Sequence, residues 1–305
     1  MSDLTITLSP VAAVESTAPT VKRRRSWPTT VLVVGPFVAY LGLFLVWPLA
    51  VVLSNALTPG GQFSLSSMTR AVSGPYRTSF LLSLRLSLIS SLIGGSIGFA
   101  LALTLRGVTR PRWFRSAVDG WAAVASQLGG IPLAFAFVAA LGSQGLVTRI
   151  LGELGWDLRA SGFNISEFSG WVLVYLYFQI PLMFLVMSPA VEGIKGTWEE
   201  AAASIGASRW RFWRHVGVPV LAPSLLAGFV LLFVNAFSAY ATAYALSNGA
   251  GQLVPLQIRF VLQGNVISGE EDLGYALVAW TVLLLIAALV TISILQRRVS
   301  KWSPR

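Results

Sequence analysis

The sequence predicts an all-α integral membrane protein with six transmembrane helices. Hydrophobic residues make up 55% of the 305-residue chain, charged residues make up 11%, and the mean hydropathy is +0.71. A soluble domain contains about 25% charged residues, so this composition excludes an ordinary soluble fold. Apolar segments long enough for the roughly 20 helical residues that a bilayer requires occur at 31–53, 80–105, 120–142, 170–190, 218–247 and 274–296.

The segments outside these spans define the expected organisation. Residues 1–26 are rich in Ser, Thr and Pro and end in a basic run, so we expect a disordered tail. The 31–53 segment is longer than the apolar part of a signal peptide and no small-x-small cleavage site follows it, so we interpret it as a retained helix. Residues 27–79 then hold the first transmembrane helix and an external loop, 80–296 a core of five transmembrane helices, and 297–305 a second basic tail.

Prolines mark three of the spans. Pro132 and Pro181 lie inside the third and fourth spans, where proline can kink a helix that packs against neighbours. The fifth span is about 30 residues long and opens with Pro219 and Pro223, so we expect part of it to lie outside the hydrocarbon.

The second span carries a possible hydrolase motif. Gly94-Gly95-Ser96-Ile97-Gly98 satisfies the G-x-S-x-G pattern of a nucleophile elbow. Ser96 lies in mid-span, however, and no span contains the His or acid that would activate it. We therefore interpret Gly94 and Gly98 as a G-x-x-x-G packing motif, with an intramembrane serine hydrolase as the alternative.

The distribution of Lys and Arg predicts the topology. The N-terminal tail, the 106–119 loop, the 191–217 loop and the C-terminal tail hold sixteen cations, and the three alternate loops hold five. Positive loops stay in the cytoplasm, so both termini and the 191–217 loop are predicted there, in a multi-pass protein of the bacterial inner membrane. This distribution explains the net charge of +10 without nucleic-acid binding. The remaining cation, Arg85 near the outer end of the second span, either snorkels to the interface or has a functional partner.

Several kinds of chemistry are missing from the sequence. There is no cysteine and only one histidine, which argues against disulfides, a metal site and His-based catalysis. None of the six apolar segments contains Asp or Glu, which argues against an ion-coupled carrier, and no G-x-x-x-x-G-K-[ST] phosphate loop is present. A transporter of this kind would take its energy from a partner. A carrier or channel that acts without an ATPase remains the alternative.

The polar 191–217 loop predicts two short helices. Thr197 and Glu200 fit a capping box, so a first helix is expected from Trp198 to about Ile205. Gly206 follows as the left-handed residue that ends it. Ser208 can cap a second helix, which we expect to end before Pro219.

The second helix also has a simpler interpretation as a membrane-surface helix. Trp210 and Trp213 would anchor it among lipid headgroups, and Arg211 and Arg214, which share one face, would meet phospholipid. This interpretation is compatible with docking of another protein.

The spacing of this loop resembles that of a known family. Glu200-Ala201-Ala202 is followed by Gly206 and by Val216-x-Val218-Pro219. This is similar to the cytoplasmic signature of type I permease subunits of binding-protein-dependent ABC importers, with Val216 in place of Ile and Val218 in place of Leu. Residues 80–105 and 141–146 further resemble polyamine (spermidine/putrescine) permeases.

The resemblance implies a transport subunit that is not itself an enzyme. It would pair with a second, identical or homologous permease subunit, two ATP-binding subunits that hold ATP and Mg, and an extracytoplasmic substrate-binding protein, and would bind no cofactor of its own. Alternating access would carry a small polar solute, with a polyamine as our expectation and a sugar, phosphonate or iron as alternatives. The residues to which the resemblance assigns ATPase coupling are Glu199, Glu200, Ala201, Ala202, Gly206, Arg211, Arg214 and Pro219.

Polar residues inside spans are the candidates for a translocation path. An unsatisfied polar group is costly in lipid, so such residues face protein or water. Asn235, Ser238 and Thr242 follow helical spacing on one stripe. Hydrogen bonding between helices is the alternative role. The full set of candidates is Gln127, Gln179, Asn235, Ser238, Tyr240 and Thr242.

Overall fold

A computed structural model describes residues 27–107, 111–158, 160–249, 251–263 and 271–300, and the elements among them are all helical. The predicted disorder of residues 1–26 lies outside this part of the chain, as do residues 301–305. The helices are α1 (Trp27–Leu41), α2 (Trp47–Leu57), α3 (Ser66–Ala71), α4 (Gly74–Arg106), α5 (Arg112–Gln127), α6 (Gly130–Leu141), α7 (Leu146–Glu153), α8 (Phe168–Glu192), α9 (Gly196–Ser204), α10 (Arg209–Phe212), α11 (Val218–Ser238), α12 (Tyr240–Leu246), α13 (Val254–Leu262) and α14 (Glu271–Ser300).

The predicted fold class is confirmed. Within the described residues, six helical stretches are long and apolar enough to cross a membrane. The chain divides into two compact units, residues 1–49 and 50–305. In the first, α1 contains Pro36 and leads through a π-helical turn, Gly42–Val46, into the start of α2. The second unit holds the features described below.

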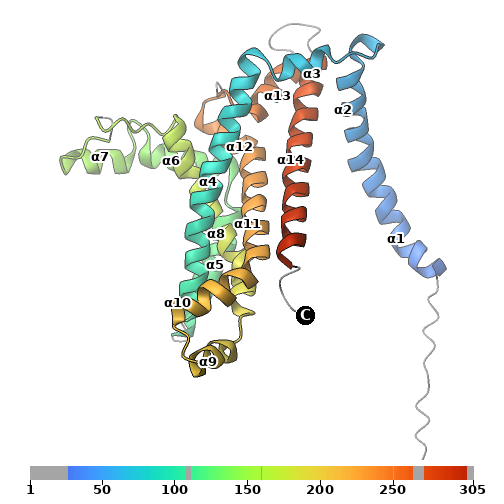
Figure 1. The fold of residues 1–305 in the computed structure, drawn as a ribbon. Coiled ribbons are helices and arrows are strands. Elements are labelled where there is room, and N and C mark those ends of the chain that lie inside the picture. The colour runs from blue at the N-terminus through green and yellow to red at the C-terminus, as the bar shows by residue number, and fades with distance from the viewer. Residues whose placement is uncertain (1–26, 108–110, 159, 250, 264–270, 301–305) are drawn as a thin grey trace, which may run out of the picture. The chain divides into compact units, whose positions relative to one another are not determined.

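The centre of the second unit is the pair formed by α4 and α8 (Figure 1). The face that α4 buries consists largely of Ser and Gly, and its hydroxyls donate to carbonyls of their own helix, as from Ser87 to Ser83 (2.8 Å) and from Ser90 to Leu86 (2.7 Å). These bonds let serine enter an apolar interface without an unpaired donor. At Gly98 a Cβ would lie 2.4 Å from the Ile180 carbonyl oxygen, so only glycine fits.

This packing confirms the G-x-x-x-G interpretation of the second span. Helix α4 is continuous through Ser96, whose side chain is exposed on the side away from the buried glycines. A nucleophile elbow needs a turn between a strand and a helix. The interpretation of this motif as a nucleophile elbow is therefore wrong.

Two spans that the sequence presents as single helices are broken. The third is interrupted at Leu128 and Gly129, between α5 and α6, and Pro132 lies in the first turn of α6 and not at the break. The fifth is interrupted at Ala239, whose ψ of 80° is not helical, so the membrane-crossing stretch ends at Ser238 and not near residue 247. In contrast, α8 continues through Pro181.

The ends of α4 define the two ends of this unit. At the N-terminal end, the Val254 N–H of α13 donates to Ser83 Oγ (2.9 Å), and α3 lies close by. At the C-terminal end lie α9 and α10 (Figure 1). The cation-rich 106–119 and 191–217 loops therefore share one end, as the predicted topology requires. Which side of the membrane this end faces remains a prediction.

Candidate functional site

Helix α9 begins earlier than the sequence predicts. It starts at Gly196 with Lys195 as N-cap, no side chain caps it, and the Trp198 N–H donates to the Lys195 carbonyl (3.1 Å). Thr197 thus lies inside the helix, so the predicted capping box with Glu200 is wrong. The Glu200 side chain is exposed and is not bound to the cap.

The end of α9 is as predicted. Gly206 has a φ of +79°, in the left-handed region that favours glycine. Its N–H donates to Ala203 O (2.9 Å), and the Ala207 N–H donates to Ala202 O (3.0 Å). These two bonds form a Schellman motif, which turns the chain sharply after α9.

The following helix starts as predicted but does not end where expected. Ser208 Oγ accepts the Arg211 N–H (3.3 Å), so Ser208 is the N-cap of α10. Beyond α10 a π-helical turn, Trp213–Gly217, leads directly into α11, and Pro219 lies at the start of that helix. Proline lacks an N–H and crowds the carbonyl four residues earlier, and the wider turn before it accommodates both defects.

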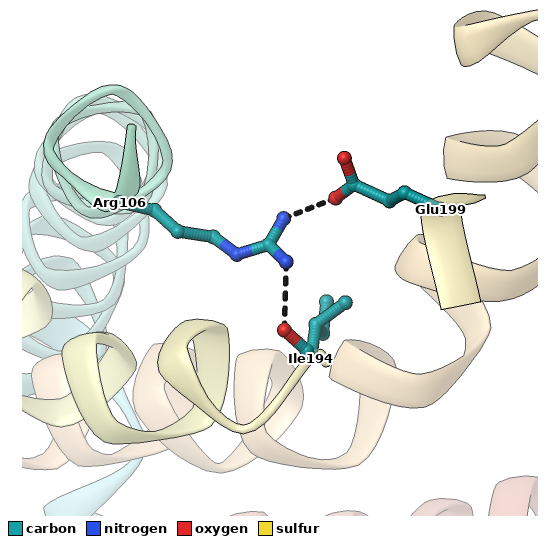
Figure 2. Close-up of polar contacts among 3 residues, drawn as sticks. All are labelled: Arg106, Ile194 and Glu199. Carbon is teal, nitrogen blue, oxygen red and sulfur yellow. Dashed lines mark hydrogen bonds and ion pairs between the residues drawn. The ribbon is translucent and has the colours of Figure 1, made fainter. Parts of the chain in front are cut away.

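Arg106, the last residue of α4, holds α9 in place. Figure 2 shows its guanidinium between two acceptors: Nη1 donates to Glu199 Oε1 and Nη2 to the Ile194 carbonyl (2.7 Å). The same guanidinium lies over the Trp213 ring, 5.6 Å from its centroid. Arg106 therefore connects a transmembrane helix to α9 and to the π-helical turn that follows α10.

The two tryptophans of this loop have different surroundings. Trp213 is half-buried, under Arg106 and against Gly217, so part of its ring packs against the protein, and its anchoring in lipid headgroups stays a prediction. Trp210 is 75% exposed. Phe212 between them is buried in the core with Leu105, which fixes the loop to the end of the bundle.

A second ionic contact lies at the same end. Arg115 of α5 pairs with Glu192 at the end of α8, and its Nε lies 3.9 Å from Asp119. The 106–119 and 191–217 segments are thus connected to the same helix, α8.

One face of α9 and the turn after it is open. Glu200, Ala201 and Gly206 are exposed, and Ile205, at 85%, is the most exposed large apolar side chain in the part of the chain that the structure describes. Ala202 is half-buried against the core. Among the other predicted coupling residues, Glu199 contacts Arg106, and the exposed ones are Arg211, Arg214 and Pro219.

The two helix breaks lie side by side. The Gly130 N–H at the start of α6 donates to Thr242 Oγ1 of α12 (2.9 Å). The Tyr175 hydroxyl of α8 donates to the carbonyl of Ala239 (3.1 Å). Side chains thus satisfy backbone groups that the breaks release, which non-helical backbone at membrane depth requires.

The predicted path residues divide into two groups around these breaks. Gln127 and Ser238 end α5 and α11, one at each break, and both are exposed; Asn235 and Tyr240 are half-buried. Thr242 and Gln179 are buried, and Gln179 Nε2 donates to Ser90 Oγ (3.0 Å). The expected continuous stripe of Asn235, Ser238 and Thr242 is wrong, because the break at Ala239 separates its last member.

Arg259 of α13 is a residue whose position the sequence did not reveal. Its Nη1 donates to the Tyr240 hydroxyl and its Nε to Gln263 Oε1 (3.0 Å), and its guanidinium lies 4.4 Å from the ring centroid of Tyr244. Hydrogen bonding with Tyr244 is the main cause that raises the pKa of Arg259. The sequence identified Arg259 only as a charge outside the spans. The spacing of Tyr240 and Tyr244, one turn apart, was the available signal.

A hollow adjoins Arg259. Its volume is about 420 Å³, and it lies at the end of the unit opposite α9. Its lining residues are Tyr244, Asn248, Gly249, Leu256, Arg259, Phe260 and Gln263.

Comparison with protein families decides the family of this chain. The family described as "Binding-protein-dependent transport system inner membrane component" matches residues 94–302. The chain belongs to this family. It is therefore a multi-pass membrane permease component, and a carrier or channel outside such systems is not supported.

Individual permeases of this kind are similar to this chain at low sequence identity. A probable sulfate transport system permease protein of Chlorella vulgaris is 27% identical over 56% of this chain, and the match spans 61% of that relative's length. The molybdenum transport system permease protein ModB of Haemophilus influenzae is 28% identical over 56% of this chain and 72% of its own.

A solved structure shares the fold. It is a chain of a bacterial ABC transporter involved in the import of the acidic polysaccharide alginate, with a TM-score of 0.70, 18% identity, and coverage of 90% of this chain and 96% of that one. At this identity the similarity concerns the fold alone. The type I permease fold implied by the signature loop is thus supported, whereas the relatives are named for sulfate, molybdenum and thiamine and give no support to a polyamine.

Proposed function

We propose that this permease subunit is driven by ATP-binding subunits that dock on α9. The observation that carries the proposal is the open face of α9, with exposed Glu200, Ala201 and Ile205, on a helix that Arg106 ties to α4. Small side chains let another protein approach closely, and an exposed isoleucine supplies an apolar contact. The partner subunits would hold the ATP and Mg, and this chain would hold neither.

The motion would reach the membrane through Arg106. A push on α9 acts on α4 through Glu199 and on the end of α8 through the Ile194 carbonyl. Since α4 and α8 interlock through small residues, the pair moves together. The helices that end at Gln127 and Ser238 would then change between inward-facing and outward-facing arrangements. Both residues are exposed, and we expect a second permease subunit to close the path there.

The cargo we propose is a small inorganic oxyanion, delivered by a substrate-binding protein outside the membrane. Relatives named for sulfate and molybdenum transport support this class. A polyamine carries several positive charges and would be expected to meet carboxylates along its path. The six apolar segments contain none.

Substitution of Ala201 tests the docking surface. Ala201→Trp places a bulky ring on the open face of α9, so we expect the ATP-binding subunit to be lost on copurification and ATP-dependent uptake of radiolabelled sulfate and molybdate to fall by about tenfold or more. Ala160→Trp, the same change at an exposed position of the outer loop, is the matched control and should retain both. Undiminished uptake by Ala201→Trp, or uptake by the purified chain alone in vesicles, would refute the proposal.

A further inference from the structure

Arg259 lies next to the broken fifth span. It reaches from α13 to Tyr240, the first residue after the break at Ala239. The Tyr175 hydroxyl marks the level of this break, and Tyr175 lies 17 residues before the end of α8 at Glu192. At about 1.5 Å per residue, the break is roughly 25 Å from the α9 end, in the outer part of a 30 Å hydrocarbon layer under the predicted topology.

The charge of Arg259 is not neutralised by a carboxylate within the part of the chain that the structure describes. Its neighbours there are the Tyr240 hydroxyl, Gln263 Oε1 and the ring of Tyr244. A guanidinium has five N–H donors. Even with a hydrogen bond to Tyr244, this arrangement leaves donors for a ligand.

The neighbouring side chains also orient the guanidinium of Arg259. The Tyr240 and Tyr244 rings lie 5.7 Å apart on the same side of α12, and the guanidinium packs against both. Cation–π contacts orient the planar group, and the N–H donors that are not bonded to Tyr240 and Gln263 stay available for a ligand. The hollow of about 420 Å³ beside Arg259 gives such a ligand room.

We infer that Arg259, oriented by Tyr240 and Tyr244, forms an anion-binding site on the outer side of the broken fifth span. A tetrahedral oxyanion such as sulfate or molybdate is the ligand that fits, because an arginine edge donates two parallel hydrogen bonds to two oxygens of one anion. The choice of an oxyanion as the ligand rests on the proposed function. Under this inference, the cargo first contacts the permease at these residues.

Binding to the purified full chain tests the site without any transport partner. Millimolar molybdate should raise the unfolding temperature of the chain in detergent, at constant ionic strength set with chloride, because a ligand of the folded state stabilises it. Arg259→Gln should abolish this shift, and Arg259→Lys should keep part of it. Arg149→Gln removes an equal charge from an exposed position of α7 and should keep the full shift. The inference would be overturned if neither molybdate nor sulfate raised the unfolding temperature of the unsubstituted chain. It would also be overturned if the unfolding temperature of Arg259→Gln rose by the same amount.

Uptake measurements separate this site from the proposed function. In cells with the complete transport system, Arg259→Gln should lower oxyanion uptake by about tenfold or more, the loss expected for a charge-assisted hydrogen bond, while the ATP-binding subunit still copurifies. Unchanged uptake in Arg259→Gln would overturn the site and leave the proposed function standing. A different outcome would support the site and refute the proposed cargo. In it, molybdate raises the unfolding temperature of the purified chain in an Arg259-dependent way, whereas cells with the complete transport system import thiamine and neither oxyanion.

Discussion

The side chain of Arg106 is a central polar contact between the 191–217 loop and the membrane part of this permease. It meets Glu199 and the Ile194 carbonyl with separate nitrogens and covers Trp213. The sequence analysis assigned both Glu199 and Glu200 to ATPase coupling and could not distinguish their roles. The partner of Glu199 lies 93 residues away, and local spacing contains no information about such a contact. Arg259 was missed for the same reason, since its partner Tyr240 belongs to another helix.

A double-mutant cycle measures the Arg106–Glu199 contact. We expect Arg106→Met and Glu199→Gln to be non-additive by about 1 kcal/mol in the free energy of unfolding, because both side chains are only partly exposed. The control cycle pairs Arg106→Met with Glu200→Gln and should be additive within about 0.5 kcal/mol, because Glu200 points to solvent. Denaturation of the purified chain in detergent provides the values. Equal coupling in the two cycles would contradict the assignment of Glu199.

The helices show which predictions a sequence can support. The end of α9 at Gly206 and the cap of α10 at Ser208 were correct because a few neighbouring residues determine each. The breaks in the third and fifth spans were missed because hydropathy continues across them. Gly129-Gly130 was a usable signal for the first break, whereas nothing local distinguishes Ala239, whose carbonyl is satisfied by Tyr175 of a distant helix.

Thr242 tests how the breaks are stabilised. Thr242→Val keeps the shape of the side chain but removes the oxygen that accepts the Gly130 N–H, so we expect a loss of about 1–3 kcal/mol in the free energy of unfolding. Thr242→Ser keeps the acceptor and should lose less. Chemical denaturation in detergent compares the two variants. If the valine variant matched the serine variant in stability, this hydrogen bond would not support the break.

At the scale of the whole molecule, composition predicted the class of protein and the number of spans, and the loop spacing predicted the family. These features depend on the average hydropathy of long segments and on one motif, so distant contacts do not alter them. The two cation-rich loops do lie at one end of the unit. The identity of the cargo could not be predicted in this way, because much of the resemblance to polyamine permeases lies in α4, whose buried Ser and Gly residues serve helix packing.

The absence of cysteine from the sequence permits a direct test of topology. Two substitutions each introduce one thiol at an exposed position. Leu154→Cys lies just after α7, and Ile205→Cys lies just after α9. In right-side-out vesicles a membrane-impermeant maleimide should label Leu154→Cys, and it should label Ile205→Cys only after permeabilisation, because positive loops stay inside. Labelling in the reverse order would invert the predicted orientation.

The unbroken course of α4 has one more consequence. This helix has 33 residues and is about 50 Å long, and no proline interrupts it after its first turn. One end is bonded to α9 and the other to α13, the helix that carries Arg259. Because the helix is unbroken, a tilt or shift imposed at one end is transmitted along its length toward the other. Movement of α9 on ATP binding and release of the cargo from Arg259 would thus be coupled through a single continuous helix. No chain of side-chain contacts would be needed between the two sites.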